Sequence, residues 1–538
     1  MVSKMRNMAA RLDHSKKCPV CEVVLEENLG DHIKGVHGEE AFRNAVLKAK
    51  ELGMPDPDIG AIYGITFKQL EEIITDAYGI NISVLKKPRR VKYWGPRKFR
   101  EEATSVWSFK QRGDWATHDG RYRGNWSPYI PRNVILKYSK PGEVVLDYFV
   151  GGGTTAVEAK LLGRRCIARD INPAAIGLTR ENLNFDSKPL LGNFGIYEPE
   201  VSVGDARDLS DIPDGSVDLI CAHPPYAGII NYSSKVEGDL SKFKIEDFLV
   251  EMGKVARESY RVLKPGGKCA ILIGDTRKHK QVVPIGFRTI RIFLDAGFVL
   301  KELVIKRQHN CKTTGFWYER SVKYNFLLLA HEYLPIFEKP EQKKLGAHYC
   351  FKGDILSYKS SIRKINGDGR ENLETTTVWI LPQEKMDEEI KRNLIGRLLT
   401  SDSHYLEIIF DDVNEKIDAK TNVSPSLVYV SFPKKLGQEG INSYLRAVKE
   451  IAVEASAFLA AEGFLVIDTR DIRINGLVFP MGVTLLEQIS PLSEFEIKEI
   501  VIVTPDSKND SLKTPSNSQN LEIVHRYLLI FTLKRGKR

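Results

Sequence analysis

Short apolar runs separated by amphipathic stretches dominate the chain from residue 144 to residue 276. Residues 144–146, 166–168 and 219–222 are such runs, each about the length of a buried strand. Apolar positions at helical spacing follow the first run, at residues 156–162. Strand and helix patterns that alternate in this way predict an α/β fold with a mostly parallel sheet, whose ligand lies at the carboxyl edge of the strands.

Two of the predicted strands end in residues suited to a flat, nucleotide-like ligand. The strand at 144–147 runs into Gly151, Gly152 and Gly153, and glycine lets the backbone come close to a ligand because it tolerates positive φ and has no side chain. The strand at 219–222 stops at residues 223–226, His-Pro-Pro-Tyr, a rigid exit that can hold a flat ring against the tyrosine. The pair predicts a nucleotide-type cofactor site that faces a site for a planar base.

Three carboxylates follow successive predicted strands. Asp147 ends the first strand, Asp170 ends the second and Asp205 follows the third. Asp170 lies about 20 residues after the glycines, where an acid can accept hydrogen bonds from a ribose diol. Any one of these residues could be an ordinary capping residue, but three in this order favour ligand binding.

These motifs resemble those of a known enzyme family. Residues 149–154, from Phe149 through Gly151 and Gly153 to Thr154, resemble the FxGxGT cofactor motif of the S-adenosylmethionine-dependent DNA amino-methyltransferases. Residues 223–226 resemble the family's (Asp/Asn/Ser)-Pro-Pro-(Tyr/Phe) catalytic motif. The resemblance covers roughly residues 104–333 and implies a Rossmann-like methyltransferase sheet that binds S-adenosylmethionine and methylates adenine N6 or cytosine N4.

The resemblance also assigns cofactor contacts. Asp147 would face the methionine amine, Asp170 the ribose and Asp205 the adenine amino group. Asn125 and Trp126 lie in the aromatic-rich segment just before the glycine motif, and they are candidates to line the methionine end. A packed, β-rich edge is the alternative explanation for these aromatic residues.

The catalytic motif departs from the family at one position. Residue 223 is histidine, which would accept one N–H of the target amine, while the carbonyl of Pro224 accepts the other and Tyr226, after Pro225, stacks on a base flipped out of the duplex. Neutral imidazole can accept a hydrogen bond and its protonated form cannot, so activity should fall as the pH drops through the imidazole pKa. The histidine also removes the usual cue to the target base, and we favour adenine N6 slightly over cytosine N4.

The amino-terminal residues 1–38 carry a metal-binding pattern. Cys18, Cys21, His32 and His37 have the spacing C-x2-C-x10-H-x4-H, which suits a tetrahedral, structural Zn²⁺ held by a cysteine knuckle and a short helix. The gap between the pairs is two residues shorter than the usual twelve. The sequence predicts a C2H2-like zinc finger and leaves open whether it contacts DNA, contacts protein or is purely structural.

Residues 39–85 predict helices with a tight turn between them. Residues 58–66 followed by apolar positions 70, 73 and 74 resemble the helix-turn-helix of bacterial and archaeal regulators, in which the glycine permits the turn and the threonine caps the second helix. The outward side chains would then be Phe67, Lys68, Gln69 and Glu71. The alternative is a helical hairpin that only packs.

Composition restricts the compartment and the partners. The net charge of +9 is mild for 538 residues, but residues 86–102 form a basic linker with interleaved aromatics, suited either to phosphate contact or to solvation. Seven cysteines, most of them scattered singly, indicate a reducing compartment. We find no signal peptide and no apolar run of the ~18 residues needed to span a bilayer, so we expect a cytoplasmic protein of a bacterium, an archaeon or a virus.

Residues 341–538 repeat short patterns of residues 103–340, which we call the second lobe and the first lobe. The matched segments, in order, are 374–379 with 103–107, 392–395 with 132–135, 427–433 with 219–225, 466–470 with 273–277, 478–480 with 282–284 and 525–529 with 322–326. Six matches in one order favour an internal duplication over the generic similarity of two α/β domains.

The second lobe lacks what the chemistry needs. Residues 409–412, Ile-Phe-Asp-Asp, stand where the glycine turn should be, and residues 431–434 read Ser-Phe-Pro-Lys. We therefore expect a degenerate, cofactor-free lobe that either packs on the first as an internal pseudo-dimer partner or forms part of a DNA cleft. Residues 504–520, rich in Ser, Asn and Lys, are predicted to form a mobile loop.

Together these patterns predict a DNA amino-methyltransferase that acts on double-stranded DNA. Since we find no nuclease motif, any restriction endonuclease would be a separate protein. Two alternatives remain open: an RNA or tRNA base methyltransferase, because guanine-N2 enzymes also use a Pro-Pro-Tyr motif, and a non-catalytic DNA-binding regulator with a decayed methyltransferase fold.

Overall fold

The protein is described here from a computed structural model. The described residues are 17–24, 28–52, 54, 56–78, 91, 93–118, 122, 124–185, 195–227, 236–309, 321, 323–341, 356–365, 373–410, 423–492, 494–506 and 520–534. The chain forms two compact units, the first made of Met1–Phe99 and Arg112–Glu258, the second of Arg100–Gln111 and Ser259–Arg538. Each unit is described by itself below.

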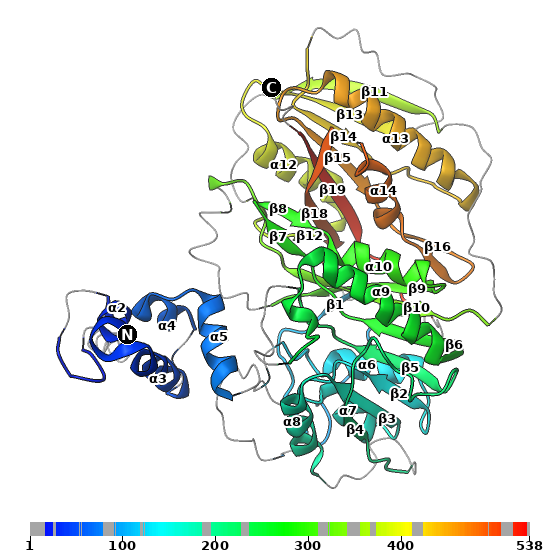
Figure 1. The fold of residues 1–538 in the computed structure, drawn as a ribbon. Coiled ribbons are helices and arrows are strands. Elements are labelled where there is room, and N and C mark those ends of the chain that lie inside the picture. The colour runs from blue at the N-terminus through cyan, green and yellow to red at the C-terminus, as the bar shows by residue number, and fades with distance from the viewer. Residues whose placement is uncertain are drawn as a thin grey trace. The chain divides into compact units, whose positions relative to one another are not determined.

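The amino-terminal part of the first unit is a helical module (Figure 1, blue). Its elements are α2 (Leu29–His32), the π-helix η1 (Ile33–His37), α3 (Gly38–Glu51), α4 (Asp56–Tyr63) and α5 (Phe67–Tyr78). One hydrophobic core contains Cys18 and Leu29 from the predicted finger together with Phe42, Tyr63 and Ile74 from the predicted helical segment. The two predicted modules therefore share a core.

A tight turn joins α4 to α5, as the sequence predicts. Gly64 has a φ of 66°, a conformation that favours glycine. Thr66 and Gln69 cap α5 reciprocally, since the Thr66 hydroxyl accepts from the Gln69 amide at 3.3 Å and the Gln69 side chain accepts from the Thr66 amide at 2.8 Å. Gln69 is exposed. The side chains of Phe67, Lys68 and Glu71, and residues 86–90 of the basic linker, lie outside the described part of the chain.

Four parallel strands form the sheet of the first unit, in the order β5-β2-β3-β4. They are β2 (Val144–Asp147), β3 (Arg165–Asp170), β4 (Glu200–Val203) and β5 (Val217–Ala222). The accompanying helices are α6 (Tyr129–Tyr138), α7 (Thr154–Leu161), α8 (Pro173–Leu183), the 3-10 helix η2 (Leu240–Lys242) and α9 (Ile245–Val262), which ends in the second unit. Parallel strands place their carboxyl ends at one edge, so the residues after all four strands meet there.

The second unit begins with elements of the first lobe. These are β1 (Val106–Ser108), β6 (Leu263–Ile271), β7 (Thr276–Lys278), β8 (Gln281–Val283), α10 (Ile285–Asp295), β9 (Val299–Arg307) and β10 (His331–Glu338). Their strand order is β1-β9-β10-β6, in which β1 is parallel to β9 and β10 is antiparallel to both of its neighbours.

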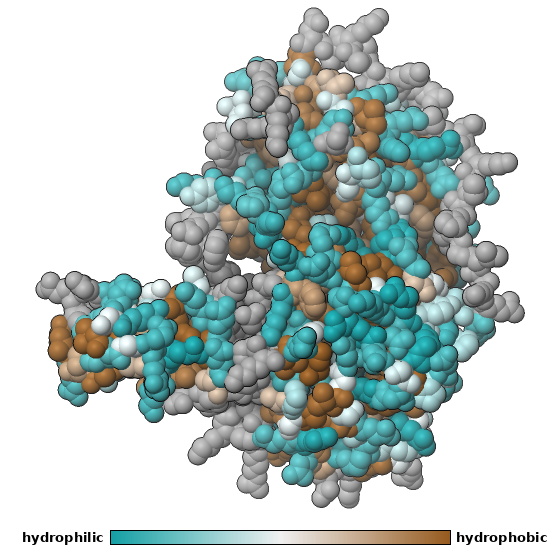
Figure 2. All heavy atoms as spheres, in the orientation of Figure 1, coloured by the Kyte–Doolittle hydropathy of each residue, from teal (hydrophilic) through white to brown (hydrophobic). Residues whose placement is uncertain are grey.

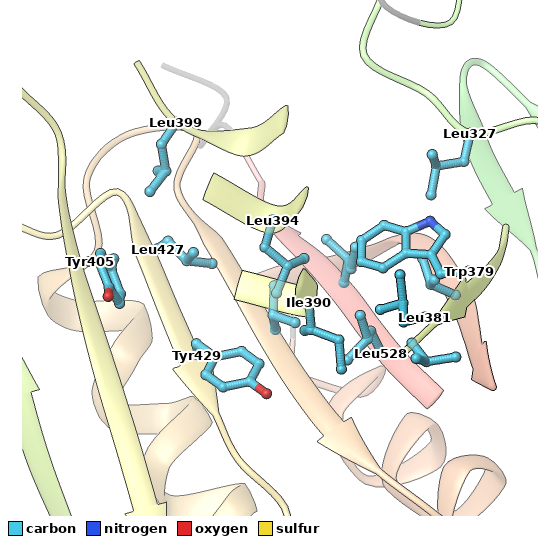
Figure 3. Close-up of a cluster of buried hydrophobic side chains, with 14 of the residues drawn as sticks. Leu327, Trp379, Leu381, Ile390, Leu394, Leu399, Tyr405, Leu427, Tyr429 and Leu528 are labelled. Carbon is cyan, nitrogen blue, oxygen red and sulfur yellow. The ribbon is translucent and has the colours of Figure 1, made fainter. Parts of the chain in front are cut away.

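The second lobe, also in this unit, is built on a seven-stranded sheet in the order β11-β13-β14-β15-β19-β18-β12. Its elements are β11 (Tyr358–Lys364), β12 (Val378–Leu381), η3 (Gln383–Lys385), α12 (Met386–Leu398), β13 (His404–Phe410), β14 (Leu427–Val430), η4 (Gln438–Gly440), α13 (Ile441–Phe458), β15 (Phe464–Thr469), β16 (Ile472–Ile474), β17 (Leu477–Phe479), α14 (Met481–Ile489), β18 (Phe495–Pro505) and β19 (Arg526–Leu533). Figure 3 shows its core, where Trp379, Leu394 and Tyr429 come from different elements of the lobe.

The two lobes share a strand plan. The order β12-β18-β19-β15 repeats β1-β9-β10-β6. β12 is parallel to β18 as β1 is parallel to β9, and β18 is antiparallel to β19 as β9 is antiparallel to β10. The parallel pair β13 and β14 likewise corresponds to β2 and β5. β11 is antiparallel to β13, where β3 is parallel to β2, and the described part of the second lobe has no counterpart of β4.

The contacts correct two of the predicted correspondences. Asp275 and Asp471 each accept a hydrogen bond from the glycine amide near the start of the next helix and another from a tyrosine, so Asp471 rather than Asp468 matches Asp275. The tyrosines are Tyr333 and Tyr527, so residues 525–527 match 331–333 rather than 322–324. The first shift is three residues and the second is nine.

The face of the protein that Figure 2 shows is predominantly polar. On the face in view in Figure 2, hydrophilic residues cover most of the described surface and hydrophobic residues appear between them. Within the described ranges, no helix has both the length and the apolar character that a membrane crossing requires. Residues 507–519 of the predicted mobile loop lie outside those ranges.

Candidate active site

A pocket opens at the carboxyl edge of the parallel sheet in the first unit. It encloses about 690 Å³ of empty space, part of which is open to solvent. The predicted site residues Asn125, Trp126, Phe149, Gly151, Asp170, Asp205, His223 and Pro225 line it, together with Tyr122, Gly124, Tyr148, Val150, Ile171, Asn172, Ala206, Gly238, Asp239 and Leu240. The lining residues do not include Asp147, Gly153, Thr154, Pro224 or Tyr226.

The glycine turn is shaped by a close approach from within the chain. Gly151 has a φ of 52°, and a Cβ added there would lie 2.8 Å from Cε1 of Tyr122. A Cβ at Gly152 would lie 2.7 Å from Nδ2 of Asn125. Glycine is therefore needed here to admit the segment that contains Tyr122 and Asn125. Gly153, with a φ of 85°, is the N-cap of α7, which begins at Thr154.

A buried carboxylate anchors the same wall of the pocket. Glu158, on α7, accepts hydrogen bonds from Trp115 Nε1 at 2.6 Å and from Arg132 Nη1 at 2.8 Å, and its other contact is His118 Nε2 at 2.8 Å. Burial alone would raise the pKa of Glu158, but these partners hold it below its ordinary value. The sequence analysis missed both Glu158 and Tyr122. The only signal was the density of aromatic residues before the glycine motif.

Two of the predicted acids, at the ends of β2 and β3, accept hydrogen bonds from backbone amides of the segment that leads into the glycine turn. Asp170 lines the pocket, and its two oxygens accept from the amides of Gly151 and Asn172, each at 2.9 Å. Burial raises its pKa to about 6, and the nearby Asp239 adds to the shift. Asp147 is buried, and its Oδ1 accepts from the Phe149 amide at 2.9 Å. Burial raises the pKa of Asp147 to about 7.

The third predicted acid already has a cationic partner. Arg207 donates to Asp205 through Nε at 2.9 Å and Nη2 at 2.6 Å, and it also donates to Glu251 at 2.7 Å. Asp205 therefore reaches the pocket with a neutralised charge. Asp239, a second acid missed from the sequence, is buried in the pocket wall and caps η2 by accepting from the Ser241 amide.

The His-Pro-Pro-Tyr turn places its imidazole between two aromatic rings. Trp126 stacks on His223, with ring centroids 5.6 Å apart and an interplanar angle of 23°. Tyr226 lies nearly perpendicular to His223 on another side, and its hydroxyl is 3.4 Å from Nε2. The predicted cofactor-side residue Trp126 thus also orients the predicted catalytic residue.

The four predicted metal ligands come together. The ligand atoms of Cys18, Cys21, His32 and His37 all lie within 4.8 Å of one another, and Cys21 Sγ is 3.4 Å from His32 Nε2. His32 ends α2, and His37 ends the π-helical turn η1. Nε2 of His37 is buried and has no hydrogen-bond partner in the structure. A compact N/S donor set with one orphaned nitrogen fits a tetrahedral metal ion.

The second lobe has an acid at the corresponding strand position, and this acid is paired with cations. Glu407 of β13 pairs in register with Tyr429, two residues before Ser431, and so takes the position of Asp147. Lys391 forms an ion pair with Glu407, and Arg363 lies 3.6 Å from it. Elsewhere in this lobe, the ring centroid of Tyr444 lies 5.2 Å from that of Phe410 and 5.4 Å from that of Phe432. Residues 411 and 412 of the replaced glycine turn lie outside the described ranges.

The chain is similar to parts of known methyltransferases. The chain is similar to the tRNA (guanine(10)-N2)-dimethyltransferase of Methanothermobacter thermautotrophicus, at 37% identity over 129 residues, 24% of this chain and 34% of that protein. It is similar to the Type II methyltransferase M.MthZI of Methanothermobacter thermautotrophicus, at 32% identity over 160 residues, 26% of this chain and 44% of that protein. Among solved structures, TrmN from Thermus thermophilus is 22% identical, with 40% of this chain and 50% of that chain covered and a TM-score of 0.26.

The match to these relatives is partial and the match to a family is broader. The chain spans between a third and a half of the length of the two methyltransferases named above. The family model described as DNA methylase matches residues 71–181 and 217–422, which is more than half of the chain. The chain therefore belongs to the N6/N4 DNA methylase family.

Proposed function

We propose that the protein transfers a methyl group from S-adenosylmethionine to the exocyclic amine of a base flipped out of double-stranded DNA, with adenine N6 favoured over cytosine N4. The observation that carries this proposal is the meeting of the glycine turn, Asp170 and His223 in one pocket. The named Type II methyltransferase relative supports DNA as the substrate.

The residues of the pocket fit the methyl donor. Asp170 is held by two backbone amides and would accept from the ribose hydroxyls, beside a glycine turn that admits the ligand. Asp147 would face the methionine amine and Asp205 the adenine amino group. When bound, S-adenosylmethionine supplies an electrophilic methyl group.

The chain's own residues would prepare the amine. An exocyclic amine is a poor nucleophile, because its lone pair is delocalised into the ring. Acceptors on both N–H groups favour the pyramidal form, and these would be neutral His223 and the carbonyl of Pro224. Trp126 fixes the plane of the imidazole by stacking, and Tyr226 would stack on the base.

Two further parts of the chain have proposed roles. The cysteine and histidine cluster would hold a structural Zn²⁺, which stabilises a module whose described core spans only residues 18–74. The second lobe would be non-catalytic, because Glu407, at the position of Asp147, is paired with Lys391, and because the lobe's sequence lacks the glycine turn and the Pro-Pro-Tyr motif. The same proposal includes contact between the amino-terminal module and DNA, and a restriction endonuclease, if there is one, that is a separate protein.

A tRNA base is the second candidate substrate, since one relative carries that name and matches at 37% identity. The test is transfer of radiolabelled methyl groups to genomic DNA and to total tRNA in parallel, followed by nucleoside analysis, with Tyr226→Ala as the control. We expect N6-methyladenine in DNA and its loss in the control. Label in tRNA alone would reject DNA as the substrate, and the absence of label in both, with intact binding of S-adenosylmethionine, would reject methyl transfer.

A further inference from the structure

A buried hydrogen-bond chain in the first lobe ends on a hydroxyl that the second lobe supplies. The Tyr333 hydroxyl donates to Asp275 at 3.2 Å, and His331 Nε2 lies 2.9 Å from Tyr333 Oη. Nδ1 of His331 lies 2.9 Å from the hydroxyl of Thr377, which belongs to the second lobe. The first lobe's chain is incomplete without that residue.

The second lobe contains the same hydrogen-bond chain. Here the first lobe supplies the hydroxyl at its end. The Tyr527 hydroxyl donates to Asp471 at 2.9 Å, and His525 Nε2 lies 2.8 Å from Tyr527 Oη. Nδ1 of His525 lies 2.7 Å from the hydroxyl of Ser105, which belongs to the first lobe. Each lobe therefore gives one hydroxyl to the other.

A backbone amide donates to the hydroxyl at the end of each hydrogen-bond chain. The amide of Ala330 donates to the Thr377 hydroxyl at 3.0 Å, and the amide of Val524 donates to the Ser105 hydroxyl at 3.1 Å. Each hydroxyl still has its own hydrogen to give to the histidine Nδ1, and in that arrangement Nε2 carries the ring hydrogen and donates it to the tyrosine oxygen. Burial lowers the pKa of His331 to about 3, which keeps that ring neutral at ordinary pH.

A second exchange uses charge. Arg277 of the first lobe donates to Glu499 of the second at 3.0 and 2.6 Å, and Arg473 of the second lobe donates to Glu302 of the first at 2.5 Å. Each glutamate also accepts from a leucine amide, that of Leu327 at Glu499 and that of Leu521 at Glu302. Both glutamates are almost fully buried.

Reciprocal contacts of this kind are the property of an isologous, two-fold interface, in which residue i contacts j and the counterpart of j contacts the counterpart of i. Four exchanged side-chain contacts, each with its matched partner, obey that rule here. We infer that the second lobe serves as a built-in second subunit. It covers, within one chain, the surface through which two copies of the first lobe would otherwise pair. This inference rests on the proposed duplication and non-catalytic second lobe, and its test does not depend on methyl transfer.

The test uses the full chain with a protease site inserted between residues 345 and 346. The folded protein is cut there and analysed by size exclusion with light scattering. We expect the two pieces to stay together as a one-to-one complex that does not pair with a second copy. Pieces that separate at neutral pH in moderate salt, or uncut chains that dimerise through this surface, would overturn the inference.

Two sets of variants test the named contacts. Glu499→Arg should release the cut pieces, Glu499→Arg with Arg277→Glu should restore their association, and Asp402→Arg is the matched control, because its ion pair with Lys364 is exposed and lies within the second lobe. Should Glu499→Arg fail to fold, Thr377→Val replaces it, with an expected roughly tenfold loss in the folding equilibrium constant that disappears when His331 is already Phe. Equal behaviour of Glu499→Arg and the control, or no coupling between Thr377 and His331, would contradict the exchange.

Discussion

Replacement of Gly151 by alanine tests the glycine turn most directly. The residue has a φ of 52°, its amide donates to Asp170 at 2.9 Å, and its carbonyl accepts from the Thr179 hydroxyl at 2.8 Å. These two bonds hold the backbone in the left-handed region, so the loop cannot relax by rotating. The new Cβ would lie 2.8 Å from Cε1 and 3.2 Å from Cδ1 of Tyr122.

The expected magnitude has two parts. A non-glycine residue in the left-handed region costs about 1–2 kcal/mol, and displacement of a packed ring by an added methyl group costs about 1–3 kcal/mol. We therefore expect Gly151→Ala to lower the free energy of unfolding by about 2–5 kcal/mol. Because Tyr122 lines the pocket, its displacement should also weaken binding of S-adenosylmethionine by about tenfold or more, since each factor of ten corresponds to about 1.4 kcal/mol.

The assays are urea unfolding of the ligand-free protein and calorimetric titration with S-adenosylmethionine. Gly177→Ala is the matched control, because Gly177 lies in α8, is exposed, and has no atom within 4 Å of an added Cβ. The control should be more stable than the parent by up to about 1 kcal/mol, with unchanged affinity. A Gly151→Ala protein as stable as the control, with an affinity within twofold of the parent, would refute the proposed role of the close approach.

Three further predictions concern the pocket and the cluster. Because burial raises the pKa of Asp170 to about 6, the carboxyl is protonated below that pH and loses acceptor capacity, so the affinity for S-adenosylmethionine should rise as the pH increases from 5 to 8 in calorimetric titrations. Asp170→Asn should bind weakly and with a shallower rise over this range, since only Asp147, whose pKa burial raises to about 7, still titrates there. A parent profile no steeper than that of the variant would count against the assignment. At saturating S-adenosylmethionine, His223→Asn should retain methyl transfer, because the amide oxygen still accepts a hydrogen bond from the target amine, whereas His223→Ala should lose about a hundredfold or more. Purified protein should contain one zinc ion per chain by mass spectrometry, and chelation or Cys21→Ser should unfold the amino-terminal module first. An unchanged melting profile after removal of the metal would contradict the structural role.

The sequence predicted which residues of the site lie at the strand ends, but it did not predict which side chains pack against them. Asp147 and Asp170 could be located because apolar runs mark buried strands and parallel strands share one carboxyl edge. Tyr122 could not, because its contact with Gly151 joins residues 29 positions apart through the fold. Glu158 was missed because a charged residue in a helix ordinarily indicates a solvated face, and its burial depends on three partners in another segment.

The register of the second lobe shows a different limit. Residues 468–473 read Asp-Thr-Arg-Asp-Ile-Arg, so the pattern Asp-x-Arg occurs twice in succession and the sequence offers no reason to choose the second. The choice is made by tertiary contacts. Asp471 meets the amide of Gly482 and the hydroxyl of Tyr527, while Asp468 accepts from Tyr429 inside the lobe. A short pattern can therefore indicate a repeat and still misplace its register.

The two lobes also provide an internal comparison for the proposed ligand site. Both place an acid near the end of the strand that precedes the turn. In the second lobe this acid, Glu407, is paired with Lys391 and lies near Arg363. In the first lobe neither Asp147 nor Asp170 forms an ion pair with another described residue, and their raised pKa values show that burial disfavours the ionised form. The acid of the second lobe is therefore neutralised by a cation, whereas the acids of the first lobe carry the free-energy cost of burial. Strongly perturbed acids at a pocket are typical of functional sites, and a cationic methyl donor is the kind of ligand that would relieve them.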